Sequence, residues 1–567
     1  MQTTPLPVSR RQFFRTALIA PLASACAVGS NARGRFSHGV ASGDPDAQSL
    51  LLWTRYLPDD GGSVTLDWQV AADAGFSKLL ASGKVEASAA RDHCAKAVAG
   101  GLPADSLVYY RFRAPDGQMS VTGRGRTLPS PGPLPGPQSG ERAMTLAVFA
   151  CANIGFGYFN AYAHAAARDD IDLLLHLGDY IYEHNFGVYP NAAQRPPGRD
   201  ALDPPHEIIA LADYRRRYAF YRADPDLQAL HARHAMMAIW DDHEFANDTW
   251  MHGAQNHQAN EGPWEVRRDA ARQAYYEWLP IRDADLLYRQ VKLGQLADLI
   301  LLDTRLIGRD RQVSAPRELY NAAPDSAEYA RAMQRYRQQL HDPARQMLGP
   351  AQEAWLDAAL AQSAARGARW QIVAQQVLVG DRPTPPQLAG MLPPEASAAL
   401  RLGLERRPLI AAQGLTTQPD SWPGYMAART RFLGSLARPG QHAVLLAGDT
   451  HNAWAYDHKV QGRHVAEFGT PGVCSPGLET SIPIAPAAVA AAMRGANPDM
   501  VWCDTAHRGY MSLTVSRETA RATWHLFDSI RRRDAKASTE SSLTAGADAR
   551  GVMLNSKVVA VQSSGLI

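Results

Sequence analysis

The stretch "AMMAIWDDHE", residues 235–244, passes abruptly from apolar side chains to charged ones. Its apolar half predicts a buried strand, and Asp241, Asp242, His243 and Glu244 follow without a spacer. Carboxylates this close to a core repel one another, and their pKa values rise unless a cation neutralises them. A strand that runs out into a solvated turn would tolerate the same acids, so this motif alone leaves two interpretations open.

The same pattern recurs along the chain. Six apolar stretches predict strands: 143–151, 171–179, 235–244, 297–305, 370–377 and 442–451. Amphipathic stretches that predict helices lie between them. Residues able to bind metal stand at the carboxyl ends of four strands: Cys151, Asp179, Asp242 with His243, and Asp449 with His451. Ligands of layered α/β folds bind at such strand ends, so we expect one shared pocket. Taken alone, Asp179 also fits a cap of the following helix.

Residues 35–129 have a different pattern. Short β-branched and aromatic runs, separated by Gly, Pro and Asp turns, predict a small all-β sandwich of the fibronectin or immunoglobulin type. Pro- and Gly-rich residues 130–141 predict a linker to an α/β domain over 142–533. The Ser-, Ala- and Gly-rich residues 534–567 predict a loose tail.

Residues 1–32 have the pattern of a twin-arginine signal peptide. Arg10 and Arg11 precede the apolar stretch 17–29, which is too short to span a bilayer. Such signals direct folded proteins to the Tat export machinery. We expect cleavage after Ala32, and Cys26 offers a weaker, lipoprotein-type alternative. The mature protein is then periplasmic or secreted, with no transmembrane anchor after processing.

Charge and cysteine content narrow the classes of protein further. Lys plus Arg number 58 against 56 Asp plus Glu, so no basic surface for nucleic acid is evident. Four cysteines follow Cys26: Cys94, Cys151, Cys474 and Cys503. In an oxidising compartment, the simplest interpretation is that they form two disulfides. A metal-binding role for Cys151 would remove it from such pairing.

Four motifs together resemble a known family: "SHGVASGDP" (37–45), "GDYIYE" (178–183), "WDDHE" (240–244) and "GDTHNAW" (448–454). They are similar, in this order, to the PhoD-type alkaline phosphatases of the calcineurin-like metallophosphoesterase superfamily. The resemblance extends over nearly the whole mature chain. It implies a four-layer αββα core behind the small β-sandwich, and a metal-dependent enzyme that hydrolyses phosphate esters to inorganic phosphate.

The resemblance also implies a set of metal ligands. Fe³⁺ would be held by Cys151, Asp179, Tyr182 and His451, and Asp179 would bridge to Ca²⁺ held by Asp242 and Asp449. Thiolate and phenolate suit Fe³⁺, whereas a site made of oxygen ligands suits Ca²⁺. A metal-activated hydroxide would then attack phosphorus in line.

His243 is the predicted proton donor to the leaving oxygen, and its plain structural alternative is a buried histidine bonded to Asp241 or Asp242. By the same resemblance, Asn153 would contact phosphate, and Asn247 and Asp248 would complete the calcium shell, although loop capping explains Asn247 and Asp248 equally well. Other histidines are expected in surface or capping roles: His164, His184, His231, His234 and His442. Three arginines near the motifs are left outside the site, because the chain has many: Arg305, Arg429 and Arg431.

Three rival functions remain. A phosphodiesterase or phospholipase D-like hydrolase could use the same metals on diester or phospholipid substrates. An exported binding protein could carry a degenerate core, although the complete ligand set argues against this. A thiol hydrolase could use Cys151 as its nucleophile, but the surrounding carboxylates would raise the pKa of the thiol and weaken it.

Overall fold

The structure is a computed structural model that describes residues 35–132, 142–534, 536–555 and 558–561. The predicted signal peptide, with Cys26, and residues 133–141 of the predicted linker lie outside the described residues. None of the helices in these ranges is long and apolar enough to cross a membrane.

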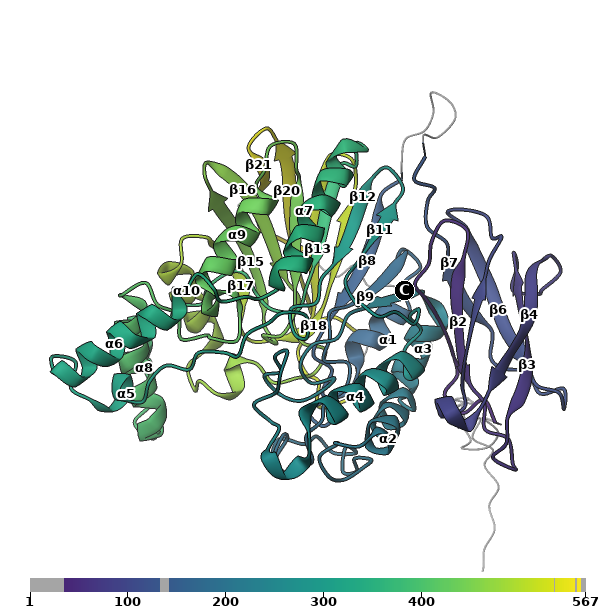
Figure 1. The fold of residues 1–567 in the computed structure, drawn as a ribbon, viewed down its shortest axis with the longest axis horizontal. Coiled ribbons are helices and arrows are strands. Elements are labelled where there is room, and N and C mark those ends of the chain that lie inside the picture. The colour runs from purple at the N-terminus through teal and green to yellow at the C-terminus, as the bar shows by residue number, and fades with distance from the viewer. Residues whose placement is uncertain (1–34, 133–141, 535, 556–557, 562–567) are drawn as a thin grey trace, which may run out of the picture. The chain divides into compact units, whose positions relative to one another are not determined.

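Two ladders of strands form the centre of the chain after residue 142 (Figure 1). The first has the order β11 (Arg289–Leu293), β12 (Ala297–Leu301), β13 (Trp370–Ala374), β14 (Ala443–Ala447), β16 (Arg463–Gly469), β15 (Ala453–Val460) and β17 (Met500–Asp504). The second has the order β10 (Met236–Ala238), β9 (Leu173–His176), β8 (Met144–Phe149), β18 (Arg508–Val515), β19 (Thr519–Phe527) and β20 (Thr539–Asp548). Strands β21 (Gly551–Leu554) and β22 (Val559–Val561) both pair with β20.

Pairing within each ladder is mixed. The run β12, β13, β14 and β16 is parallel, as is the run β8, β9 and β10. One register pair, His464 with Gly551, links the ladders. The helices are α1 (Asn160–Ala166), α2 (Leu211–Arg222), α3 (Pro225–Arg233), α4 (Trp264–Trp278), α5 (Glu318–Asn321), α6 (Ala327–Leu340), α7 (Gly349–Ala365), α8 (Ala398–Ala411), α9 (Met426–Leu436) and α10 (Pro486–Ala496).

Side chains of the first ladder alternate between two cores. Ile372 and Leu446 belong to the same core cluster as Leu146 of the second ladder. Their sequence neighbours Val373 and Leu445 pack instead with residues of α7 and α9. Successive side chains of a strand point to opposite faces, so one face of this ladder meets the other ladder and the opposite face meets helices.

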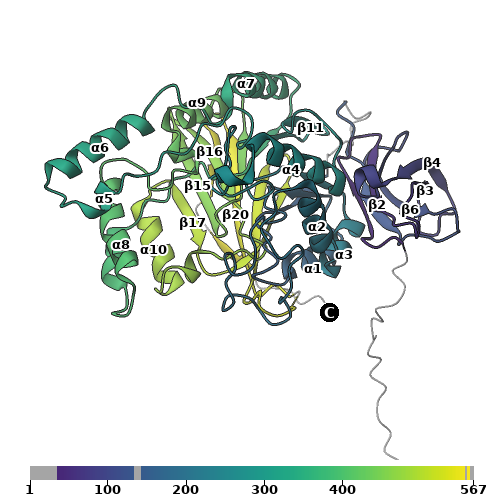
Figure 2. The same cartoon turned by 60° about the horizontal axis from the view of Figure 1, so that its bottom comes forward.

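The second ladder is covered by helices in the same way. Phe149 of β8 packs edge-on against Tyr162 of α1, with ring centroids 5.2 Å apart. Figures 1 and 2 show α7 and α9 over the first ladder, and α1 with α3 beside the second. The layers therefore run helix, sheet, sheet, helix, which confirms the predicted four-layer αββα architecture.

Residues 35–129 are mainly β-structure, as predicted. Strands β4 (Leu79–Ala87), β3 (Val64–Ala71), β6 (Leu107–Arg113) and β7 (Gly123–Arg126) form one antiparallel sheet. Strands β1 (Val40–Gly43), β2 (Leu50–Arg55) and β5 (Cys94–Ala99) form a second layer, which continues into the large sheet where Gly43 pairs with Met236 of β10. A β carbon at Gly43 would lie 1.9 Å from the carbonyl oxygen of Pro280, so this approach requires glycine.

The prediction of a loose tail over 534–567 is wrong for residues 539–548, 551–554 and 559–561, which form strands. β20 pairs antiparallel with β19 from Thr539 to Gly546, and Leu543 and Ala545 are buried. The small residues misled the prediction, because Ser, Ala and Gly are common in linkers. Here they form a strand whose alternate side chains face the core.

Candidate metal centre

The candidate ligands follow strands that end at the same side of the two ladders. Cys151 follows β8, Asp179 follows β9 and Asp242 follows β10, and these three strands are parallel neighbours. Asp449 and His451 follow β14 of the facing ladder. Short loops after adjacent carboxyl ends necessarily lie together, which is why residues far apart in sequence converge.

The backbone turns sharply at most of these positions. Cys151, Asp179, Asp449 and His451 have positive φ values of 59°, 56°, 63° and 63°. This left-handed conformation costs about 1–2 kcal/mol for a residue other than glycine. Gly178 precedes Asp179 at φ 103°, and a β carbon there would lie 2.3 Å from the backbone nitrogen of Asp241. Concentrated strain of this kind marks functional sites, where it orients side chains.

Four predicted ligands of the first metal lie together. One ligand atom each from Cys151, Asp179 and His451 lies within 4.8 Å of the others. The hydroxyl of Tyr182 donates to Oδ2 of Asp179 at 2.8 Å and lies 3.5 Å from Nε2 of His451. Nδ1 of His451 is 2.6 Å from the carbonyl oxygen of Pro476, so that carbonyl orients the ring and leaves Nε2 facing the other ligands.

A second group adjoins the first. Asp241, Asp242 and Asp449 offer oxygens within 4.8 Å of one another, and so do atoms of Asp179, Asp242 and His243. Asp179 belongs both to the group with Cys151 and His451 and to the group with Asp242 and His243. A carboxylate that bridges two metals requires such a shared position. Oδ2 of Asp241 is buried and has no hydrogen-bond partner among the described residues. Sequence reasoning did not select Asp241 as a ligand.

The electrostatics of these side chains fit a bound cation. Burial raises the pKa of Asp179 well above its usual value, and that of Asp449 to about 7. Burial also raises the pKa of Asp241 to about 8 and that of the Cys151 thiol well above its usual range. A multivalent cation reverses this preference and holds such groups ionised. Together with the orphaned oxygen of Asp241, the donor set fits metal binding, with sulfur, phenol and imidazole on one side and carboxylates on the other.

His243 lies beside both groups, but its side-chain hydrogen-bond partner is neither of the two aspartates considered from the sequence. Nδ1 of His243 is 2.6 Å from Oε2 of Glu183, not bonded to Asp241 or Asp242. Glu183 is itself held by the backbone nitrogen of Asn247 at 2.7 Å and by Nδ2 of Asn256 at 2.9 Å. Burial alone would lower the pKa of His243, but Glu183 and the nearby aspartates raise it well above its usual value. In the absence of metal, the contact with Glu183 thus favours the protonated imidazole.

Two further side chains organise the site and were missed from sequence. The buried Arg305 donates to Oδ1 of Asp241, to Oδ2 of Asp420 at 2.8 Å and to Oδ1 of Asp449 at 3.2 Å. Arg305 is the last residue of the predicted strand 297–305. The metal ligands were selected because they stand at strand ends, so the same criterion could have identified Arg305. Arg429 and Arg431 bond Val379 and Glu353 instead.

The other missed side chain is Glu244, the last residue of "WDDHE". Its carboxylate accepts hydrogen bonds from the backbone nitrogens of Asp179 at 2.8 Å, Tyr180 at 2.6 Å and Asp241 at 2.7 Å. It therefore ties the loop after β9 to the loop after β10 and fixes the separation of their carboxylates.

The remaining predicted residues surround the centre. Nδ2 of Asn153 is buried without a partner among the described residues, while Oδ1 accepts from Gly155 at 3.1 Å. The side chain of Asn247 donates to Gln255 at 3.0 Å. The backbone nitrogen of Asp248 donates to Oδ2 of Asp242 at 2.6 Å and so holds that carboxylate in place.

The cysteine and histidine interpretations need correction. Cys94, Cys151, Cys474 and Cys503 are all free and buried, so the two-disulfide interpretation is wrong for the described residues. Cys94 and Cys503 belong to different hydrophobic cores, where the thiol packs as an apolar group. His231 is buried, not on the surface, and bonds the Tyr180 hydroxyl. His234 is also buried, but it is the C-cap residue of α3, as the capping alternative predicted, and its ring bonds the carbonyl oxygen of Ala165.

Comparison with known proteins identifies related sequences and structures. The model of the PhoD-like phosphatase family matches residues 146–524, and the model of its N-terminal domain matches residues 22–129. Alkaline phosphatase D of Bacillus subtilis is 31% identical over 545 residues, which cover 91% of this chain and 82% of that protein. A solved structure of PhoD superposes with a TM-score of 0.72 at 28% identity, covering 92% of this chain and 93% of that one.

A purple acid phosphatase from yellow lupin seeds shares the fold at 11% identity, with a TM-score of 0.51 and coverage of 86% and 71%. The family models and the bacterial relative together span both the β region and the α/β region. The chain belongs to the PhoD-like phosphatase family of phosphoric ester hydrolases.

Proposed function

We propose that this protein is an exported, metal-dependent phosphoesterase that hydrolyses phosphate monoesters and releases inorganic phosphate. One observation carries the proposal: Asp179 belongs to two overlapping groups of ligand-type atoms, each within 4.8 Å. A shared carboxylate between two such groups is the arrangement of a two-metal hydrolytic site. The twin-arginine pattern at residues 10–14 supports export.

Cys151, Asp179, Tyr182 and His451 would hold Fe³⁺, and Asp179, Asp242 and Asp449 would hold Ca²⁺. When bound, the metals supply Lewis-acid activation of a water molecule and neutralise charge on the phosphate oxygens. The chemistry of the donors supports this assignment, because thiolate and phenolate favour a ferric ion and carboxylates favour calcium.

The remaining steps belong to the side chains. His243, held protonated by Glu183 at Nδ1, donates a proton from Nε2 to the leaving oxygen. Nδ2 of Asn153 would donate to a phosphate oxygen, and its lack of a partner among the described residues supports this role. No side chain of this set acts as the nucleophile, so we expect a single displacement at phosphorus without a phosphoenzyme.

The test is metal analysis and a visible spectrum of protein purified without chelators, with hydrolysis of p-nitrophenyl phosphate as the activity. Iron and calcium should copurify, with an absorption band from thiolate or phenolate charge transfer to Fe³⁺. Tyr182→Phe should shift the band, whereas Tyr189→Phe should leave it unchanged as the matched control, because Tyr189 is not a proposed ligand. A colourless, metal-free and fully active protein would overturn the proposal.

A further inference from the structure

A third aromatic ring, that of Tyr189, lies beside the candidate metal centre. It is nearly parallel to the ring of His243, with an interplanar angle of 13° and ring centroids 6.4 Å apart. The centroid of Tyr182 is 6.0 Å away on another side. Tyr182 is a proposed metal ligand and His243 is the proposed proton donor, so Tyr189 adjoins both parts of the proposed site.

The hydroxyl of Tyr189 is free to bind a substrate. The residue is partly exposed, and its hydroxyl makes no hydrogen bond within the ranges that the structure describes and is not enclosed by other atoms. Neighbouring tyrosines differ in this respect. The hydroxyl of Tyr182 donates to Oδ2 of Asp179 at 2.8 Å, and that of Tyr158 donates to the carbonyl oxygen of Pro197 at 2.6 Å. Tyr189 therefore keeps a donor that its neighbours have already used.

Electrostatic interactions agree with the ring contacts on where this hydroxyl lies. Burial is the main cause that raises the pKa of Tyr189, the negative charges of Asp179 and Cys151 raise it further, and Arg508 opposes them. Interactions between charges decay with distance, so the phenol is close to these ligands. The hydroxyl thus lies on the side of the centre that Asp179 and Cys151 form.

The loop that carries Tyr189 is held at both of its ends. At its start, the buried Arg217 donates from Nη1 to the carbonyl oxygen of Tyr182. At its end, Pro190 packs against the loop that follows β8, where a β carbon at Gly155 would lie 2.7 Å from Cδ of Pro190. Glycine at position 155 permits this close approach.

The ring itself is also held in place. Phe156 packs edge-on against it with centroids 4.6 Å apart, and His184 does so at 5.7 Å. The backbone nitrogen of Tyr189 donates to the carbonyl oxygen of Asn185 at 3.3 Å. A donor that is fixed before the ligand arrives loses little conformational entropy on binding, so its hydrogen bond contributes more to affinity.

We infer that Tyr189 is a substrate-binding residue, whose hydroxyl donates a hydrogen bond to a non-bridging oxygen of the phosphoryl group. The inference rests on the proposed phosphoesterase function. A non-bridging oxygen is negatively charged in the ester and in inorganic phosphate alike, so the hydroxyl binds both. His243 has a different role, because it donates to the leaving oxygen only.

The test compares Tyr189→Phe with the wild type, both loaded with metal. The dissociation constant of inorganic phosphate, measured by calorimetry, should rise about tenfold, because one hydrogen bond to a charged group is lost. The value of kcat/KM should fall by a similar factor on p-nitrophenyl phosphate and on glycerol 1-phosphate, because both esters present the same phosphoryl oxygens. Metal content and the visible band should not change.

Tyr158→Phe is the matched control. Tyr158 belongs to the neighbouring loop between β8 and α1, and its hydroxyl is already bonded to Pro197. The substitution removes the same atom from a position outside the proposed site. Both the dissociation constant of phosphate and kcat/KM should stay within twofold of the wild-type values.

The outcomes separate the two proposals. An unchanged dissociation constant in Tyr189→Phe would overturn the phosphate contact and leave the phosphoesterase intact. A loss of kcat/KM on glycerol 1-phosphate alone would also overturn it, because the hydroxyl would then act on the leaving oxygen. Failure of the metal-loaded wild type to hydrolyse any phosphate ester would contradict the phosphoesterase, whereas weaker phosphate binding by Tyr189→Phe would still support the contact.

Discussion

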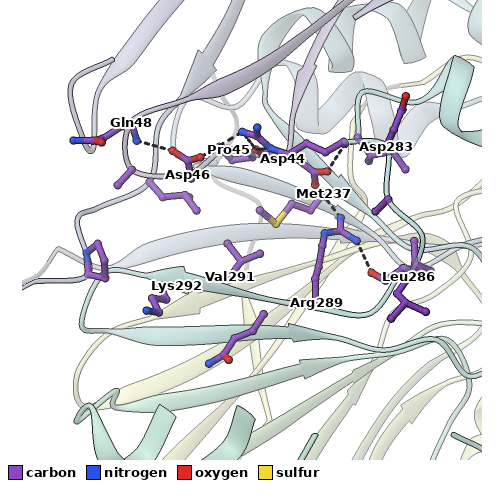
Figure 3. Close-up of a pocket in the computed structure, with 18 of the residues that line it drawn as sticks. Asp44, Pro45, Asp46, Gln48, Met237, Asp283, Leu286, Arg289, Val291 and Lys292 are labelled. Atoms are coloured by element: carbon purple, nitrogen blue, oxygen red, sulfur yellow. Dashed lines mark hydrogen bonds and ion pairs between the residues drawn. The ribbon is translucent and has the colours of Figure 1, made fainter. Parts of the chain in front are cut away.

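Two regions of this molecule concentrate charge near a core, and they balance it differently. At the seam between β1 and β11, a cavity of about 830 Å³ is lined by apolar residues such as Met237 and Val291 and by charged ones (Figure 3). Asp44 there is only 7% exposed, and it accepts from the backbone nitrogen of Arg282 at 2.6 Å and from Nη2 of Arg289 at 2.8 Å. The charge at the seam is matched by side chains of the chain itself.

The candidate metal centre lacks that balance. Asp241, Asp242 and Asp449 all contact Arg305, while Oδ2 of Asp241 has no hydrogen-bond partner in the part of the chain that the structure describes. A carboxylate with its own arginine is a structural ion pair, whereas several carboxylates around one arginine require a further cation. The difference distinguishes the seam from the candidate metal centre, although both contain buried aspartates.

The largest expected effect comes from removing the shared carboxylate. Asp179→Asn should lower kcat about 1000-fold and reduce bound metal, because several kcal/mol of charge stabilisation by the metals is lost. Asp44→Asn is the matched control at the seam, and it should keep the metal and the kcat of folded protein. Full activity of Asp179→Asn with depleted metal would contradict the contrast between the two regions.

The next effect concerns proton donation at the centre. Glu183→Gln removes the charge that holds His243, and should lower kcat on an alkyl phosphate by about 10- to 100-fold. The loss should be much smaller on 2,4-dinitrophenyl phosphate, whose leaving group needs no proton. Glu207→Gln, which removes a carboxylate that bonds Arg267 and Asn256, serves as control. Equal losses on both substrates would assign Glu183 a purely structural role.

At the seam, substitution should change stability but not catalysis. Arg289→Gln removes the guanidinium that pairs with Asp44, and should lower the free energy of unfolding by about 1–2 kcal/mol. The value is below that of a fully buried pair, because Arg289 is 25% exposed. Urea unfolding measures the loss, and kcat per folded molecule should not change. A drop in metal content would show that the seam and the centre are coupled.

The smallest effect is a dependence of metal-free stability on pH. Burial raises the folded pKa of Asp449 to about 7 and of Asp241 to about 8, in the absence of metal. An acid with a raised folded pKa keeps its full stability below its unfolded pKa of about 4, and loses it as the pH rises through the folded value. The melting temperature of chelated protein should fall relative to the metal-bound form between pH 5 and pH 8. A constant difference would contradict the charge imbalance at the centre.

Much of the fold was predictable because its signals are local. Apolar runs such as 442–451 and their alternation with helical stretches depend on neighbouring residues only, and they predicted the layered α/β part. Residues 539–546 were misjudged, because Ser, Ala and Gly have weak strand preference by themselves and pair here with β19. Long-range pairing can override weak local preference.

The sequence by itself determined which chemical groups stand at the strand ends, and Cys151, Asp179, Asp242 and His451 could be selected on that ground. Only the tertiary structure decided that Glu183 holds His243 and that Arg305 reaches four aspartates. The physical reason is that strand ends obey a local pattern, whereas partners of buried charges are chosen by distance in space. Those distances depend on how two ladders and their loops pack together.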